Sequence, residues 1–282
     1  MRVFKGHGTE NDFVVLPDLD GAVDLSPELV RALCDRHAGI GADGVLRVVR
    51  SENDAEAKDM ALEAPYFMDY RNADGSVAQM CGNGVRVFLR YLQRATLVEL
   101  DAAVATRGGV RRVRVSGDGD VTVEMGRPRI RADRPVVTAA PFAPTRADAA
   151  IDMPNPHVVV GVPDEVTLAG LDLTRPPAVD PAGPDGQNVE FVARSGPRHL
   201  LMRVHERGVG ETRSCGTGVC AVVVSAATVD GFGADGVPWR VDVPGGTCEV
   251  IWRPDGEVLL TGPAVLVAEI ELDETWLAGV GG

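Results

Sequence analysis

Cysteine is scarce in this sequence, and its spacing does not pair it. The 282 residues contain five cysteines, and no two of them form a Cys-x-x-Cys motif. An odd number at dispersed positions argues against a disulfide framework and against a zinc site with paired ligands. We therefore expect a reduced, cytoplasmic protein whose thiols are either packing residues or reagents. The cysteines are Cys34, Cys81, Cys215, Cys220 and Cys248.

Long apolar runs, basic excess and nucleotide-binding motifs are also missing. The longest apolar stretch, at 219–229, is too short to span a bilayer. The first residues, "MRVFKGHGTENDF", have no apolar core segment, so we expect no signal peptide and no membrane association. A net charge of −13 argues against nucleic acid as a partner. Neither a P-loop, nor a GxGxxG element, nor a lysine motif for pyridoxal phosphate is evident.

The patterns that are present indicate a mixed α and β protein. A hydrophobic content of 45% over 282 residues allows one large domain or two moderate ones. Several strand-like runs alternate apolar and charged residues, which is typical of antiparallel strands with one buried face. The Pro-rich stretch 134–150 reads as a surface connection. Helices are expected at 26–37, 82–94 and 216–229, and the last is apolar nearly all round, so we expect it to be buried.

Two of these helices begin at matched motifs, "CGNGV" from Cys81 and "CGTGV" from Cys215. A helix N-terminus leaves backbone N–H groups unpaired and carries a partial positive charge, so it attracts an anion such as a carboxylate. The same field favours thiolate, so we expect both thiols to be more acidic than a free cysteine. Two such helices aimed at one carbon could remove a proton from one face and deliver a proton to the other. Stereochemistry at that carbon would invert.

Other interpretations of the two cysteines remain open. A cysteine at a helix start is more often a small packed residue than a catalyst. Cys81 and Cys215 could also form a reversible disulfide in a thiol redox protein. The halves of the chain echo each other, because "DFVVL" follows Asn11 and "PHVVV" begins after Asn155, each before a Cys-Gly helix. This duplication favours catalysis and predicts two similar domains that contribute one thiol each.

At these residues the sequence resembles the diaminopimelate epimerase family, enzymes that interconvert LL- and meso-diaminopimelate without a cofactor. The resemblance extends almost from end to end as seven ordered blocks, and the segment 72–86 fits the family signature N-x-D-G-S-x₄-C-G-N-G-x-R. The blocks are "KGHGTENDFVVL", "RHAGIGADGV", "NADGSVAQMCGNGVR", "PNPHVVV", "NVEFV", "VHERGVGETRSCGTGVCA" and "VPGG".

The resemblance implies an α+β fold of two pseudo-symmetric domains. Each would wrap a mixed, largely antiparallel sheet around a central helix, with the active site in the interdomain cleft. We place the N-terminal domain at 1–126 plus 264–282 and the C-terminal domain at 127–263. The implied activity is an isomerase of lysine and peptidoglycan precursor biosynthesis, with neither metal nor cofactor. A proline or hydroxyproline racemase of the same fold is the alternative enzyme.

The resemblance also implies roles for individual residues. Cys215 would be the thiolate base and Cys81 the thiol donor in the LL-to-meso direction, with the roles exchanged in reverse. His157 and Glu206 would tune the pKa values of the thiols. Glu206 also suits the substrate ammonium, and Arg207 suits the distal carboxylate. The implied substrate-binding residues are Asn11, Asn72, Gly82, Asn83, Asn155, Asn188, Glu206, Arg207, Gly216 and Thr217.

The sequence departs from the family at two positions. Asp43 stands where some members carry a glutamine that contacts the substrate, and a carboxylate there could repel the substrate's own carboxylates. Ala268 stands where several members carry a tyrosine at the dimer contact. A homodimer is still expected, and Cys34, Cys220 and Cys248 match no catalytic block and are interpreted as buried packing residues.

Overall fold

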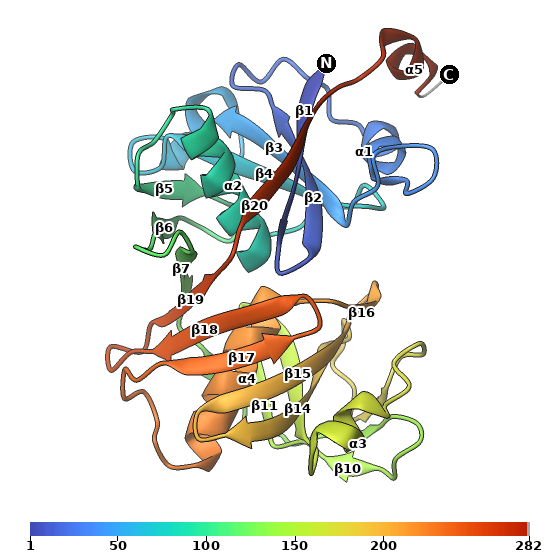
Figure 1. Ribbon diagram of the computed structural model, residues 1–282, viewed down its shortest axis with the longest axis vertical. Helices are drawn as coiled ribbons and strands as arrows, with labels where there is room; N and C mark the ends of the chain where they lie inside the picture. The colour runs from blue at the N-terminus through green and yellow to red at the C-terminus, as the bar shows by residue number, and fades with distance from the viewer. Residues whose placement is uncertain (281–282) are drawn as a thin grey trace. The chain divides into compact units, whose positions relative to one another are not determined.

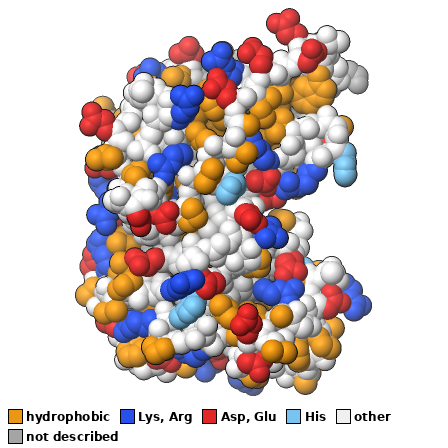
Figure 2. All heavy atoms as spheres, viewed as in Figure 1, with side chains coloured by type: hydrophobic (Ala, Val, Ile, Leu, Met, Phe, Trp, Pro, Cys, Tyr) orange, Lys and Arg blue, Asp and Glu red, His pale blue; other side chains and the backbone are white. Residues whose placement is uncertain are grey.

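The computed structural model describes residues 1–280 and confirms an α+β fold. The chain divides into two compact units, residues 1–123 with 263–282 (unit 1) and residues 124–262 (unit 2). Each unit contains a sheet and a long buried helix (Figure 1). None of the helices in residues 1–280 combines the length and the apolar character needed to cross a membrane. Acidic and basic side chains are interspersed over the surface in view (Figure 2).

Unit 1 has a sheet in the order β20–β1–β2–β3–β4–β5–β6–β7. Only the β2–β3 and β4–β5 pairs are parallel, and the other pairs are antiparallel. The strands are β1 (Arg2–Gly8), β2 (Asn11–Pro17), β3 (Gly44–Arg50), β4 (Tyr66–Asn72), β5 (Asp101–Ala105), β6 (Arg111–Val115), β7 (Val121–Gly126) and β20 (Val265–Glu271). The helices are α1 (Pro27–Cys34), α2 (Gly82–Arg94) and α5 (Glu274–Gly279), with short 3₁₀ turns η1 (Ser51–Asn53) and η2 (Lys58–Met60).

Helix α2 is the centre of unit 1. It packs against seven strands, β1 to β6 and β20. Its first eight residues, Gly82–Leu89, are all buried. The helix begins where Cys81 takes an extended conformation and its sulfur accepts the N–H of Gly84. The sheet therefore holds the N-terminus of α2, and with it Cys81, in a fixed place.

Unit 2 has a sheet in the order β8–β11–β12–β14–β15–β17–β18–β19. Here only the β12–β14 and β15–β17 pairs are parallel. The strands are β8 (Arg129–Ile130), β11 (Ala149–Met153), β12 (Asn155–Gly161), β14 (Asn188–Gly196), β15 (His199–Glu206), β17 (Trp239–Val243), β18 (Gly246–Trp252) and β19 (Val258–Gly262). Strand β16 (Gly210–Thr212) folds back and pairs antiparallel with β15. A small separate sheet contains β9 (Val136–Thr138), β10 (Thr145–Arg146) and β13 (Ala178–Asp180), and the helices are α3 (Glu165–Ala169) and α4 (Gly216–Val229).

Helix α4 is the centre of unit 2 and is buried, as its apolar sequence predicts. Its first twelve residues, Gly216–Ala227, are all buried, and the helix packs against β11, β12, β14, β15, β17, β18 and β19. Valines and alanines cover every side of this helix because the sheet curves around it. The central helix starts at Cys215, as α2 starts at Cys81.

The two units repeat the same pairing pattern. From edge to edge, both sheets run antiparallel, antiparallel, parallel, antiparallel, parallel, antiparallel, antiparallel. Strand β2 thus corresponds to β12, β3 to β14, β4 to β15, and helix α2 to α4. Each strand residue of one unit can therefore be matched to a residue of the other unit by its position in the strand pairing.

Two local expectations were wrong. The first helix ends at Cys34 rather than at residue 37, because the N–H groups of Ile40 and Gly41 both bond back to the carbonyl of Leu33. The stretch 134–150 is not only a surface connection, since it contains β9, β10 and part of β11.

Candidate active site: two thiols at helix N-termini

Cys81 lies beside two asparagines in unit 1. Its Sγ is 3.4 Å from the N–H of Gly84 and 3.7 Å from Oδ1 of Asn11, at the first residue of β2. The same Oδ1 accepts from Nδ2 of Asn83 at 3.1 Å. The Asn11 oxygen thus faces the thiol and offers it a hydrogen-bond acceptor, which suits the protonated form of Cys81.

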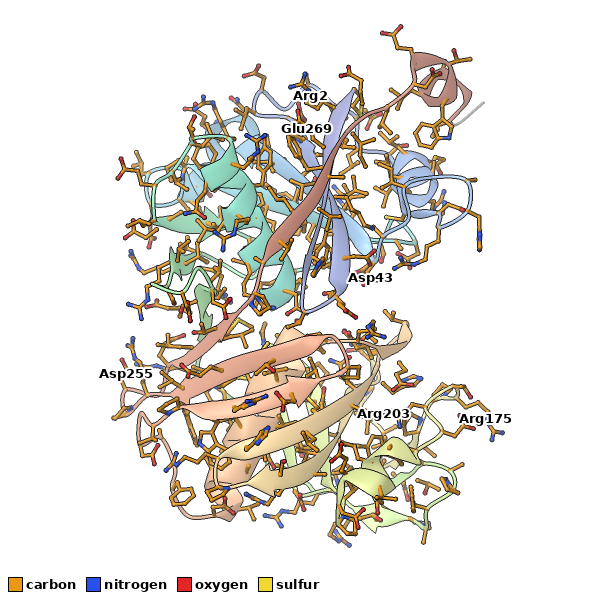
Figure 3. All side chains as sticks on the ribbon, viewed as in Figure 1. Arg2, Asp43, Arg175, Arg203, Asp255 and Glu269 are labelled. Atoms are coloured by element: carbon orange, nitrogen blue, oxygen red, sulfur yellow. The ribbon has the colours of Figure 1, made fainter. Side chains whose placement is uncertain are left out.

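Asp43 fixes the orientation of that Asn11 amide. Its Oδ2 accepts from Nδ2 of Asn11 at 2.7 Å and from the backbone N–H of Asp12 at 3.1 Å. Its Oδ1 pairs with Arg36 at 2.8 Å, so the carboxylate is locally compensated. Burial raises the pKa of Asp43, while the hydrogen bond from Asn11 opposes that effect. Asp43, labelled in Figure 3, is therefore a partner of Asn11 in this chain.

Asn72 lies at the end of β4, in the turn that leads toward Cys81. Its Nδ2 donates to Oγ of Ser76 at 3.0 Å, and its backbone N–H bonds to the carbonyl of Ser76. The turn is also held by Asp74, which accepts the N–H of Ser76. The structure gives Asn72 a local role in shaping this turn. Its substrate-binding role stays a prediction.

Cys215 is the corresponding residue of unit 2 and is more deeply buried, with 5% of its surface exposed. Its Sγ is 3.4 Å from Oγ1 of Thr217, in the first turn of α4. Burial raises the pKa of the Cys215 thiol well above its usual value, and the charges of Glu206 and Glu190 raise it further. The expectation that the helix terminus makes this thiol more acidic was wrong, because burial and two carboxylates outweigh the helix dipole.

Glu206 lies at the end of β15, where its Oε1 accepts from Oγ1 of Thr212 at 2.5 Å. Burial raises the pKa of Glu206, and hydrogen bonds from Thr212 and Cys215 lower it. Glu206 corresponds to Asn72 of unit 1, because the β14–β15 register, continued by one residue beyond Val189 and His205, places Glu206 opposite Asn188 as Asn72 is opposite Gly44. At this position of the repeat, unit 2 thus carries a carboxylate that contacts the thiol of Cys215, whereas unit 1 carries an amide.

Asn188 and Arg207 are linked through the backbone. Oδ1 of Asn188 accepts the N–H of Arg207 at 2.9 Å, and Nδ2 of Asn188 donates to the carbonyl of Pro156 at 3.3 Å. Asn188 is 4% exposed, so it ties β12 to the segment after β15. The Arg207 guanidinium donates to the carbonyl of Asp185 at 3.2 Å, on the exposed side of this segment.

His157 is fully buried, and the sequence analysis missed its partner, Glu190. Nδ1 of His157 lies 2.6 Å from Oε1 of Glu190, and Nε2 lies 3.0 Å from Oδ1 of Asn155. Both side chains of the His157–Glu190 pair are 0% exposed. A signal was present, since Glu190 interrupts an otherwise apolar buried run in "NVEFVA". Thr212, the partner of Glu206, was also missed.

The thiol sites repeat in their surroundings as well as in their helices. A Cβ added at Gly84 would lie 3.2 Å from Leu46, whereas a Cβ added at Gly218 would lie 2.7 Å from Oε1 of Glu190. Leu46 and Glu190 occupy the same register position, opposite Val15 and Val159. Both glycines thus allow a side chain of the sheet to approach the first turn of the helix.

Comparison with known proteins decides the family. The sequence pattern of the family described as diaminopimelate epimerase matches residues 3–131 and 149–267. A protein named diaminopimelate epimerase from Streptomyces coelicolor is 59% identical over 284 residues, which cover 98% of this chain and 96% of that protein. The chain belongs to the diaminopimelate epimerase family. The resemblance seen in the ordered motifs is confirmed.

Solved structures show that the fold is shared more widely. A PhzF-family phenazine biosynthesis protein from Bacillus anthracis has a TM-score of 0.71 at 16% identity, covering 97% of this chain and 99% of that one. A probable proline racemase from Agrobacterium radiobacter has a TM-score of 0.69 at 15% identity, covering 97% and 93%. At such identities the likeness concerns the fold alone, so it does not favour racemase or phenazine chemistry over the family's own.

The raised pKa of Cys215 leads to a prediction for this family member. Replacing Glu206 by glutamine removes a negative charge that opposes thiolate formation, so the pKa of Cys215 should fall and its thiolate should form at lower pH. The measurement is the Cβ chemical shift of ¹³C-labelled cysteine against pH, assigned with Cys215→Ala. The control is Glu249→Gln, which replaces an exposed carboxylate on β18. A Cys215 titration that is unmoved or moves to higher pH in Glu206→Gln would contradict the assignment.

Proposed function

We propose that this protein interconverts LL- and meso-diaminopimelate by acid–base catalysis with two thiols and no cofactor. Membership of the family and the 59% identity to a protein of that name support the substrate. The observation that carries the mechanism is the repeated placement of Cys81 and Cys215 at the N-termini of the two central helices. The reaction would serve lysine and peptidoglycan precursor biosynthesis in the cytoplasm.

In the LL-to-meso direction, Cys215 removes the proton from the α-carbon and Cys81 delivers a proton to the opposite face. The acceptor that Asn11 offers to Cys81 suits a thiol waiting to donate. In the reverse direction the two sulfurs exchange roles. Each step moves one proton between carbon and sulfur, so the two thiols return to their starting states once the product leaves and solvent re-equilibrates them.

Substrate binding would itself activate Cys215. Glu206 is the carboxylate whose charge opposes ionisation of Cys215, and it is also the proposed partner of the substrate ammonium. An ammonium bound beside Glu206 compensates its negative charge, so the pKa of Cys215 falls as the substrate arrives. The buried thiol thus holds its proton until the substrate binds, and it becomes a base beside the substrate once that proton has passed to solvent.

The ends of the substrate would be recognised by different groups. The first-turn N–H groups of α2 and α4 suit the α-carboxylate at the reacting carbon, because the positive end of a helix attracts an anion. They also stabilise negative charge that develops during proton removal. Arg207 suits the distal carboxylate, and the asparagines suit the zwitterion at the non-reacting end. The first-turn residues are Gly82, Asn83, Gly216 and Thr217, and the asparagines are Asn72, Asn155 and Asn188.

The test of this function is incorporation of solvent deuterium. Reduced protein in deuterium oxide should convert LL-diaminopimelate to the meso form with one deuterium at the inverted carbon, followed by mass spectrometry and chiral chromatography. Deuterium entering L-proline or hydroxyproline instead would favour the racemase alternative. Activity only toward disulfide substrates would favour the redox alternative. Either outcome would overturn the proposal.

We also propose a homodimer that forms along β20. This strand pairs with β1 at the edge of the unit 1 sheet, where Arg2 and Glu269 form a cross-strand ion pair (Figure 3). Val265 and Val267 on β20 are 43% and 62% exposed, so the edge offers apolar surface to a second copy. Light scattering after size exclusion should give twice the mass of the chain. Val267→Lys should lower the measured mass, because a charge on this edge opposes pairing with a second copy. A monomer mass for the unmodified protein would contradict the proposal.

A further inference from the structure

The buried pair of His157 and Glu190 carries no role so far beyond its effect on nearby pKa values. His157 lies on β12 and Glu190 on the adjacent parallel strand β14. Oε1 of Glu190 reaches His157 at 2.6 Å, while Oε2 is buried and has no hydrogen-bond partner within the described residues. The other ring nitrogen of His157 contacts Asn155 at 3.0 Å. The three side chains form one line, Glu190 to His157 to Asn155.

With the Asn155 oxygen facing His157, two protons lie on this line. Nε2 of His157 faces Oδ1 of Asn155, which is only an acceptor, so Nε2 carries a hydrogen. Nδ1 of His157 faces a carboxyl oxygen, so a second proton lies between Nδ1 and Oε1 of Glu190. Imidazolium with carboxylate and imidazole with carboxylic acid contain the same protons, and neither has net charge. A neutral pair is the form that full burial favours, because an uncompensated buried carboxylate is costly.

The internal repeat shows that the fold does not require such a pair. By register, His157 corresponds to Phe13 and Glu190 corresponds to Leu46, which take the same positions beside the first turn of α2. Both Phe13 and Leu46 are 0% exposed, so apolar residues fill this place well in unit 1. Unit 2 instead buries two ionisable groups at the same place. A requirement beyond packing therefore explains their presence.

That requirement is the orientation of Asn155. The Asn155 amide turns its oxygen toward Nε2 of His157, which leaves its amino group directed away from that ring nitrogen. If Glu190 were ionised beside a neutral histidine, Nε2 would be a bare acceptor and would draw the Asn155 amino group inward. Asn155 would then offer an oxygen, and a carboxylate ligand would be repelled.

We propose that Glu190 is a positioning residue, which shares a proton with His157 and thereby holds the Asn155 amino group available to a carboxylate of the substrate. This inference rests on the proposed function for its ligand, while the proton arrangement of the pair is independent of any activity. The ionisable groups near the pair are Glu206 and Cys215. Besides burial, the charge of Glu190 raises the pKa of both, and the charge of His157 lowers the pKa of Glu206.

The first test is ¹⁵N spectroscopy of the histidine ring in the unmodified protein. The expected result at neutral pH is a protonated Nε2 of His157, because that nitrogen faces an amide oxygen. Assignment uses His157→Phe. A signal typical of unprotonated Nε2 overturns the proposal, whether or not the protein epimerises diaminopimelate. Failure of the deuterium test, in contrast, would overturn the proposed function and leave this measurement unaffected.

The second test places the unit 1 residue types, those of Phe13 and Leu46, at the corresponding positions of unit 2. The double variant His157→Phe with Glu190→Leu should fold, because the same residues pack at the same place in unit 1, and its KM for LL-diaminopimelate should rise about tenfold. The single variant Glu190→Gln keeps His157, and its KM should lie within about threefold of that of the unmodified protein. A glutamine N–H can donate to Nδ1 of His157 and keep the hydrogen on Nε2. Glu249→Leu controls for the loss of a carboxylate in unit 2. An unchanged KM in the double variant, or a glutamine variant as impaired as the double, overturns the proposal.

Discussion

Cys215→Ala should lower the turnover of LL-diaminopimelate about 1,000-fold, and Cys81→Ala should lower the turnover of both isomers to a similar degree. Each variant removes a group that transfers a proton in the transition state, and such groups contribute about 10²–10⁴-fold. Substrate affinity should change little by comparison, so the loss should appear in kcat. The measurement is steady-state epimerisation by chiral chromatography under reducing conditions.

The matched control for both variants is Cys220→Ala. Cys220 is buried on α4, five residues after Cys215, and therefore faces another side of the helix. Its replacement removes a sulfur from the same element without removing a proposed acid or base. We expect turnover within about threefold of the unmodified protein. A Cys81 or Cys215 variant that matches this control would show that its thiol is not an acid–base group.

Gly218→Ala should destabilise unit 2 and lower the activity of the protein. A Cβ at this position would lie 2.7 Å from Oε1, 3.2 Å from Cγ and 3.3 Å from Cδ of Glu190, so the buried carboxyl or the helix must move. Overpacking of this kind costs about 1–3 kcal/mol, more than the gain of about 1 kcal/mol from replacing glycine by alanine in a helix. We expect a lower free energy of unfolding and a loss of activity.

Gly84→Ala is the matched control because Gly84 has the same place in unit 1. There the added Cβ would lie 3.2 Å from Cδ2 of Leu46, the far end of a flexible side chain. The expected change in unfolding free energy is below about 1 kcal/mol, measured by urea denaturation of both variants. Equal stability of the two alanine variants would show that the Glu190 carboxyl is not held against α4 as described.

Local sequence signals were sufficient for the two central helices. The boundaries expected at 82–94 and 216–229 agree with α2 and α4, because a cysteine at the N-cap position, two glycines and an apolar run are all contiguous in sequence. The same is true of the start of α1, where Ser26 accepts the N–H of Leu29 and Pro27 follows. The end of α1 was not predictable in this way, since it depends on how residues after the helix fold back.

Contacts between distant residues account for what the sequence could not predict. Asn11 and Asp43 are 32 residues apart, and His157 and Glu190 are 33 apart, so only strand register brings each pair together. The sign of the Cys215 pKa shift has the same origin. A helix N-terminus is visible in the sequence, but the burial and the carboxylates that outweigh it come from tertiary structure.

The most direct test of the central claim is deuterium exchange by the two variants that each keep one thiol. In deuterium oxide, Cys81→Ala should exchange the α-hydrogen of LL-diaminopimelate through Cys215 without forming the meso isomer. Cys215→Ala should exchange only the meso isomer, at its D-configured carbon, through Cys81. Mass spectrometry of the recovered isomers distinguishes these results. Exchange of the same isomer by both variants, or continued epimerisation by either, would contradict an account in which two thiols act on opposite faces of one carbon.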